Sequence, residues 1–215
     1  MTHSPSFQPS LKQRFIYLWW LKAILTTGAM FGFFELYFYL LNNPAYPVHT
    51  VPATMVDDLI NFMPAWFWVY TSLWLYTSLP ASVLWFRDEI RGYSVGMLTV
   101  CALGLLIFYA YPTTIPAQVL NDTNSLAYRL LKSMDASGNA SPSLHVATAV
   151  FAGLWFEGVL RRLSANQLFF WFNRAWCVAI VFSTLAVKQH VLIDVLSGAL
   201  LGLLVLCFFR LPRDV

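Results

Sequence analysis

Long apolar stretches are the feature of this 215-residue chain that most restricts its fold. A helix needs about 20 mostly apolar residues to cross the hydrocarbon core of a bilayer. Six stretches here come close to that length or exceed it, and none shows the period-2 alternation of a membrane-spanning β-strand. We therefore expect an all-α integral membrane protein with six transmembrane helices, over residues 15–41, 63–86, 93–111, 142–160, 168–187 and 190–209.

The composition excludes most soluble classes of protein. Hydrophobic residues make up 59% of the chain and charged residues 11%, whereas a soluble domain carries about 25% charged residues. No internal repeat or polar linker divides the chain, so we expect one domain over residues 1–215. The net charge of +3 is spread along the connections, and a nucleic-acid partner is therefore not expected. The three cysteines lie inside predicted spans without paired spacing, so we expect neither a metal nor a cofactor.

The distribution of basic residues predicts the orientation of the chain. Cytoplasmic connections of membrane proteins carry an excess of lysine and arginine. Both termini, the second connection and the fourth connection would share one side of the membrane. That side holds Lys12, Arg14, Arg87, Arg91, Arg161, Arg162, Arg210 and Arg213, whereas the other side holds only Arg129, Lys132 and Lys188. We therefore expect both termini to be cytoplasmic.

Two acidic residues inside predicted spans are interpreted as structural. Glu157 lies four residues before Arg161, so an ion pair along one helix is expected. Glu35 lies in the first span and is expected to face other helices, because a carboxylate in lipid is costly.

Two histidines begin predicted spans on the outer face. His145 heads the fourth span and His190 heads the sixth, so their imidazoles should reach the same depth. His190 and Asp194 are four residues apart, which places them on one helix face. A carboxylate in that position fixes the tautomer of an imidazole and stabilises its protonated form. Lys188 adds a positive charge at the same level.

The start of the fourth span adds a site for an anion. Pro142 is favoured at the first position of a helix, and Ser141 or Asn139 could cap it. The free N–H groups of the first turn, with the Ser143 hydroxyl, would favour phosphate. One imidazole could then attack phosphorus while the other protonates the leaving oxygen, which predicts phosphoryl transfer.

At these residues the chain resembles the type 2 phosphatidic acid phosphatase superfamily, whose motifs read K-x6-R-P, P-S-x-H and S-R-x5-H-x3-D. The second motif matches PSLH at 142–145, and the third matches STLAVKQHVLID at 183–194. The resemblance implies a metal-independent membrane enzyme with six spans and an outward-facing site. It implies that His190 becomes a phosphohistidine, Asp194 orients it, His145 is the general acid, and Ser143 holds phosphate. The remaining motif residues, Pro142 and Leu144, are expected to lie beside the substrate.

The chain departs from the family pattern at its basic residues. Thr184 stands where the third motif has arginine, and the nearest candidate for the first motif has Ala117 at the arginine position. We expect Lys188 to supply the missing charge, with Arg129 or Lys132 of the long outer connection as a second phosphate contact.

Three functions are compatible with this sequence. The first is a phosphatase that acts on a lipid such as phosphatidic acid, phosphatidylglycerol phosphate, a polyprenyl pyrophosphate or a phosphorylated glycolipid. The second is a lipid head-group phosphotransferase, since the PSLHVA form resembles the inositol phosphorylceramide synthase branch. The third is an inactive relative that binds or moves lipids. A bacterial inner membrane, with the site facing the periplasm or exterior, is the expected location.

Overall fold

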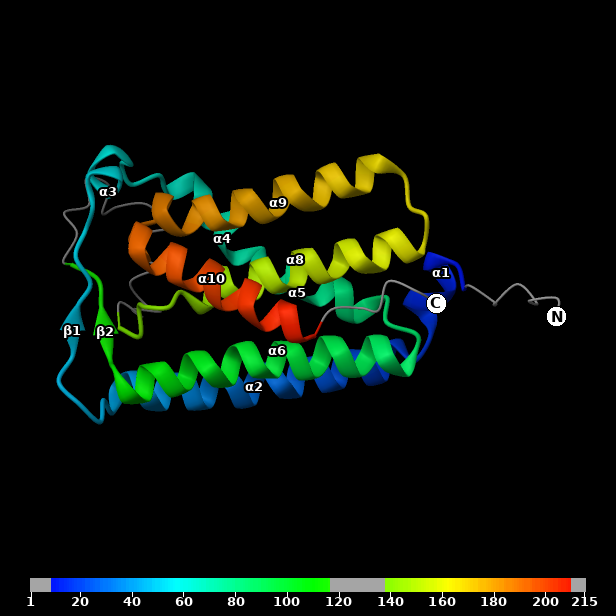
Figure 1. Cartoon of the computed structure of the whole chain (residues 1–215), viewed down its shortest axis with the longest axis horizontal. Coiled ribbons are helices and arrows are strands. Elements are labelled where there is room, and N and C mark those ends of the chain that lie inside the picture. The colour runs from blue at the N-terminus through cyan, green and yellow to red at the C-terminus, as the bar shows by residue number, and fades with distance from the viewer. Residues whose placement is uncertain (1–8, 117–137, 210–215) are drawn as a thin grey trace.

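A computed structural model of the chain describes residues 9–116 and 138–209, and within these ranges the chain is mostly helical. Figure 1 shows the long helices lying side by side along one axis. Helices occupy all six of the predicted stretches. The helices are α1 (Leu11–Ile16), α2 (Trp19–Asn42), α3 (Met55–Leu59), α4 (Phe67–Thr71), α5 (Leu73–Ser82), α6 (Arg87–Ala110), α8 (Leu144–Arg162), α9 (Gln167–Ala186) and α10 (Leu192–Phe208).

Irregular elements close one end of the bundle. A 3-10 turn, Pro64–Trp66, leads into α4. Strands β1 (His49–Thr50) and β2 (Thr113–Thr114) pair in parallel. In Figure 1 these strands and α3 lie at one end of the long axis, and α1 lies at the other end.

Three helices in the described part of the chain are long and apolar enough to cross a membrane, namely α2, α6 and α9. Helix α10 is also apolar but has only 17 residues. These helices place the protein in a membrane.

The first two predicted spans are interrupted. Leu18 adopts a left-handed backbone conformation with φ 48°, so α1 and α2 are separate helices. The second span breaks between α4 and α5 at Ser72, whose hydroxyl donates to the Val69 carbonyl at 2.6 Å and accepts the Trp176 indole N–H at 2.9 Å. A serine hydroxyl that satisfies backbone groups and a neighbouring helix allows such a break inside a bilayer. Hydrophobic pattern alone does not indicate it.

Helix α8 lies at the centre of the bundle, packed against α5, α6, α9 and α10. Its buried face includes small residues, of which Ala147, Ala149 and Ala152 are completely buried. Two glycines bring α10 onto the backbone of α8, since a Cβ at Gly198 would lie 2.3 Å from the Ser143 carbonyl oxygen. A Cβ at Gly202 would lie 2.5 Å from the Ala147 carbonyl oxygen. This is the close approach that small residues permit between membrane helices.

A buried charge cluster fastens α1 to the bundle. Arg14 and Glu89 are both fully buried, with Arg14 Nη1 2.8 Å from Glu89 Oε2. Arg162 Nη1 approaches the same carboxylate at 3.3 Å, and Lys22 Nζ donates to the Arg14 carbonyl at 2.8 Å. These bonds join α1, α2, α6 and α8. A buried ion pair of this kind leaves a costly uncompensated charge if one partner is removed.

The two intramembrane carboxylates differ from expectation in detail. Glu157 lies 3.6 Å from Arg161, as the spacing predicts, but its closer partner is Arg174. Arg174 donates from Nε and Nη2 to the two Glu157 carboxylate oxygens at 2.6 and 2.9 Å. Glu35 is exposed on the outside of α2, so the expectation that it faces other helices is wrong. Helix α2 packs against α5 and α6 through its opposite face, which carries Phe33 and Tyr37.

Candidate active site

The two histidine motifs meet where α8 and α10 begin, at the end of the bundle that carries β1, β2 and α3 (Figure 1). A backbone hydrogen bond joins the two helix starts: the Ser143 N–H donates to the Asp194 carbonyl at 3.0 Å. Gly198 makes this bond possible by letting the helices touch at that level. The fold therefore brings two segments that are far apart in sequence into direct contact.

Helix α8 begins at Leu144, and its N-cap is Ser143. The Ser143 hydroxyl accepts the Val146 N–H at 3.3 Å, as an N-cap serine does. The expectation that Ser141 or Asn139 caps this helix, with Pro142 at its first position, is wrong.

The two rejected cap residues have other partners. The Ser141 N–H donates to the Thr113 hydroxyl at 2.8 Å, and its own hydroxyl lies 3.0 Å from that of Ser197. The Asn139 amide donates to the Tyr37 carbonyl at 3.4 Å. These contacts fix the segment before α8 against β2, α10 and α2. Because Ser141 and Asn139 are engaged there, Ser143 is the N-cap of α8.

The start of α10 is capped by two carboxylates. Asp194 Oδ2 accepts the Val191 N–H at 3.1 Å, and Asp57 Oδ1, from α3, accepts the Leu192 N–H at 2.9 Å. Acidic side chains stabilise this end of a helix because its N–H groups are unpaired and the helix dipole is positive there. Asp194 thus has a structural contact in addition to its position near His190.

His190 and Asp194 face one another across one turn. His190 Nδ1 lies 3.5 Å from Asp194 Oδ2, a separation longer than an ordinary hydrogen bond. Asp194 is fully buried, and the His190 side chain is 12% exposed. The His190 N–H donates to the Thr184 carbonyl at 3.2 Å, which holds the residue at the end of α9. The geometry leaves the other ring nitrogen, Nε2, uncommitted to Asp194.

His145 lies in the first turn of α8, two residues after Ser143, whose N–H donates to the Asp194 carbonyl. Its ring stacks on that of Tyr70, with centroids 4.0 Å apart and planes inclined by 11°. Its Nε2 is buried, and no hydrogen-bond partner for that atom is present among the described residues. The structure therefore brings both imidazoles and the Asp194 carboxylate to one place.

Lys188 lies in the connection between α9 and α10 and has a left-handed backbone conformation, with φ 57°. Its ammonium donates to the Asp57 carbonyl at 2.6 Å. An ammonium has three donors, so this contact leaves capacity for an anion. Thr184, at the position of the family arginine, is fully buried and donates to the Val181 carbonyl. Arg129, Lys132 and Ala117 lie outside the described residues.

A comparison with known families decides which group of proteins shares this arrangement. Residues 51–208 match a model of the PAP2 superfamily. The chain belongs to the PAP2 superfamily. The matched range contains both histidine segments, Asp57 and every helix from α3 to α10. Comparisons with curated proteins and with solved structures gave no match.

Not every motif residue of this PAP2 protein faces the histidines. The Leu144 side chain is buried in the main core and contacts α6, where a Cβ at Gly104 would lie 2.3 Å from Leu144 Cδ2. Pro142 lines a separate groove of about 520 Å³ between β1, α6 and α10. Contact of Leu144 with substrate stays a prediction. Because its side chain is packed in the core, only its backbone is available for that contact.

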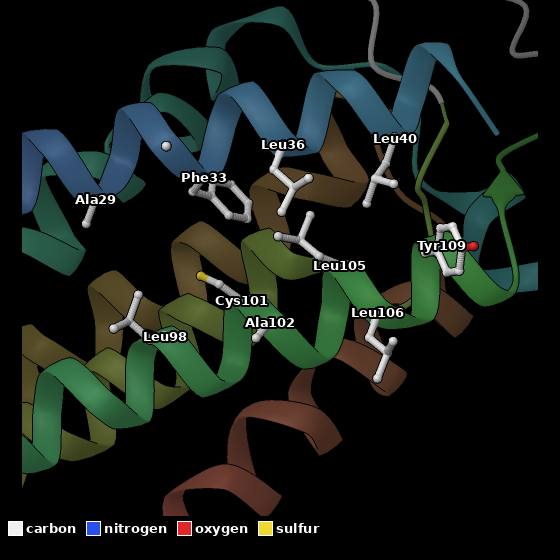
Figure 2. Close-up of a pocket in the computed structure, with 11 residues that line it drawn as sticks. Ala29, Phe33, Leu36, Leu40, Leu98, Cys101, Ala102, Leu105, Leu106 and Tyr109 are labelled. Carbon is white, nitrogen blue, oxygen red and sulfur yellow. The ribbon is translucent and has the colours of Figure 1, made fainter. Parts of the chain in front are cut away.

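A second groove lies on the side of this PAP2 protein formed by α2 and α6, with a volume of about 570 Å³. Figure 2 shows that apolar side chains of the two helices line it, among them Phe33, Leu36 and Leu105. Neither His145 nor His190 lines this groove or the groove beside Pro142.

Two residues of this site were missed by sequence reasoning. Asp57 has a local signal, because Thr54 and Asp57 form a capping box, with the Thr54 N–H and hydroxyl donating to Asp57 Oδ2 at 2.7 and 2.8 Å. That signal predicts a helix start but not the contacts with Lys188 and Leu192. Tyr70 has no sequence signal that connects it to His145.

The contact of α10 with α8 predicts the effect of filling Gly198. We expect Gly198→Ala to push α10 away from α8, because the new methyl group would meet the Ser143 carbonyl, which is backbone and cannot rotate aside. Overpacking costs about 1–3 kcal/mol, so thermal stability in detergent should fall and any turnover should fall with it.

Gly28→Ala is the matched control for this change. Gly28 lies on α2, and a Cβ there would have no atom within 4 Å. We expect unchanged melting temperature and turnover in that variant. Equal melting temperatures for the Gly198→Ala variant and the unmodified protein would show that the helices do not touch as described.

Proposed function

We propose that this PAP2 protein hydrolyses a lipid phosphomonoester or pyrophosphate at the outer face of the membrane, through a phosphohistidine on His190. The observation that supports this proposal best is the pairing of His190 with the buried Asp194 beside His145. A nucleophile, the group that orients it and a second proton carrier are the parts that covalent catalysis needs. Membership of the superfamily supports phosphoryl transfer in general.

The reaction would proceed in two steps. His190 Nε2 attacks phosphorus, and the bond from phosphorus to the lipid oxygen breaks as the P–N bond forms. His145 gives a proton to that oxygen, so the lipid alcohol leaves neutral. Water then attacks the phosphorus of the phosphohistidine, and the P–N bond breaks as the new P–O bond forms. His145 takes a proton from that water, and inorganic phosphate is released. Asp194 keeps the proton on His190 Nδ1 and stabilises the positive imidazole.

Positive potential for the phosphoryl oxygens would come from several sources. The N–H groups of Leu144 and His145 lie in the first turn of α8, where the helix dipole favours an anion. The Ser143 hydroxyl uses its oxygen as the cap, so its hydrogen stays free to donate. Lys188 would supply a full charge, with Arg129 or Lys132 as a second.

A phosphotransferase would use the same first step. An alcohol would then replace water, and the phosphoryl group would pass to a second lipid. Leu144 in the second motif favours this alternative, because the PSLH form resembles the synthase branch of the family. The two activities therefore differ only in the acceptor.

Product analysis distinguishes the candidates. Purified protein in lipid vesicles would be given phosphatidic acid, a polyprenyl pyrophosphate or a phosphorylated glycolipid, with and without diacylglycerol. Release of inorganic phosphate without added alcohol supports the phosphatase. Transfer that depends on the alcohol supports the phosphotransferase. Binding of these lipids with no chemistry in either case would support the inactive relative and contradict both catalytic proposals.

The same proposal includes a topology of six spans in a bacterial inner membrane, with both termini cytoplasmic and the histidines facing the periplasm. Single cysteines at Asn43 and Ser164, in a chain whose native cysteines are serine, test it. Both positions are exposed, in the first and fourth connections. We expect an impermeant thiol reagent to label Asn43→Cys in intact cells and Ser164→Cys only after lysis. The reverse pattern would contradict the orientation.

A further inference from the structure

The imidazole of His145 lies flat against the ring of Tyr70, on α4. Their centroids are 4.0 Å apart and their planes are nearly parallel, at 11°. A histidine side chain can rotate about two bonds, and a stacked ring restricts both rotations. Stacked aromatic pairs contribute about 0.5–1.5 kcal/mol beyond the area that they bury.

One nitrogen on the edge of the same imidazole, Nε2, has no protein partner in the part of the chain that the structure describes. That nitrogen is also buried. An unsatisfied buried nitrogen is costly, so a hydrogen-bond partner is expected at this atom, and in the proposed reaction the substrate supplies it. The first turn of α8, which carries His145, follows Ser143, whose N–H donates to the Asp194 carbonyl, so this imidazole lies near the proposed site of reaction.

Contacts on both sides of Tyr70 hold its helix, α4, in place. Ser72, two residues on, accepts the Trp176 indole N–H at 2.9 Å, and Phe67, one turn earlier, packs on Val187. Both contacts fix α4 to α9, the helix that ends at Ala186, shortly before Lys188 and His190. Helix α4, which packs on His145 through Tyr70, and helix α9, which leads to His190, therefore form one packed unit.

We propose that Tyr70 is a positioning residue for His145, holding the imidazole so that Nε2 faces the oxygen that leaves phosphorus. This inference rests on the proposed function and adds a residue to it. The contact is made by the ring face. The phenol hydroxyl is therefore not required, and a phenylalanine would serve as well as the tyrosine.

Turnover of Tyr70 variants tests the proposal. We expect Tyr70→Leu to lower kcat by about 10–100-fold, the scale on which a misplaced catalytic group acts, with little change in KM. Tyr70→Phe should keep near-normal kcat because it keeps the stacking face. Val69→Ala, on the same helix and packed in the core instead of on His145, is the matched control and should retain kcat. A low kcat in Tyr70→Phe would assign the effect to the hydroxyl and overturn the proposal.

A double mutant shows whether Tyr70 acts through His145. Residues that act as one unit give strongly non-additive effects. In a His145→Ala background, we expect Tyr70→Leu to cause no further loss of kcat. A further loss as large as in the unmodified protein would mean that Tyr70 supports packing in general, and would overturn the inference.

A chemical measurement separates this inference from the proposed function. Diethylpyrocarbonate modifies unprotonated imidazole, and the modified residue is identified by mass spectrometry. We expect His145 to react several-fold faster in Tyr70→Leu than in Tyr70→Phe, because the covering ring is lost. Equal rates would overturn the inference. Faster modification in a protein that turns over no lipid phosphate would support the stacking role and reject the proposed function.

Discussion

Replacing His190 with alanine is expected to abolish release of phosphate from the lipid substrate. Without an imidazole at this position no covalent intermediate can form. Loss of the nucleophile should lower turnover by at least about 10⁴-fold, as in other enzymes whose catalytic residues act as one unit. The measurement is phosphate release by purified protein in vesicles, with melting temperature as the control for folding.

His49→Ala is the matched control. His49 lies in β1, at the same end of the bundle, and its ring stacks on that of Tyr111 with centroids 4.4 Å apart. We expect this variant to retain turnover, because no step of the proposed reaction uses it. Normal turnover in the His190→Ala protein would remove the catalytic role of this imidazole, whatever the His49→Ala result.

Lys188→Ala is expected to cause the second largest loss, about 10²–10³-fold in turnover, the scale for one preorganised donor to a developing charge. The family arginines are absent at Thr184 and Ala117, and Lys188 is two residues from His190. Its ammonium is held at the Asp57 carbonyl, 2.6 Å away. A single hydrogen bond contributes about 1 kcal/mol, so melting temperature should change little.

Alanine variants of other lysines and arginines test which side chain supplies the positive charge that contacts phosphate. Lys12→Ala, at an exposed position in α1 at the opposite end of the bundle, should have normal turnover. Arg129→Ala and Lys132→Ala should have smaller effects than Lys188→Ala. A normal rate in Lys188→Ala together with a large loss in Arg129→Ala or Lys132→Ala would assign the positive charge that contacts phosphate to the long connection before α8.

The sequence was sufficient to predict that His190 and Asp194 lie near one another, although His190 precedes α10 instead of beginning it and does not form the expected hydrogen bond with Asp194. The spacing of His190 and Asp194 places them on one face, and the structure has their side chains 3.5 Å apart. Residues that begin two spans on the same side of a membrane must also reach similar depths, which is why His145 could be connected with His190. Family membership followed from the same two segments and is confirmed by the match over residues 51–208.

Contacts between distant segments could not be predicted in this way. Tyr70 reaches His145, and Asp57 reaches Lys188 and Leu192, only because α4 and α3 fold against α8 and α10. At the start of α8, the residue types that favour a helix start were overruled by tertiary hydrogen bonds. Pro142 and Ser141 have the residue types of a helix start, but tertiary hydrogen bonds engage Ser141 elsewhere and Ser143 becomes the cap.

The central claim is that phosphorus becomes bonded to His190. The most direct test is to mix the protein with lipid labelled in its phosphate with ³²P, stop the reaction within milliseconds in alkaline denaturant, and identify the labelled peptide. Phosphohistidine survives alkali and is lost in acid, which distinguishes it from a phosphoserine. The account predicts acid-labile label on the peptide that contains His190, and none in His190→Ala. Label on another residue, or active protein that never becomes labelled, would contradict it.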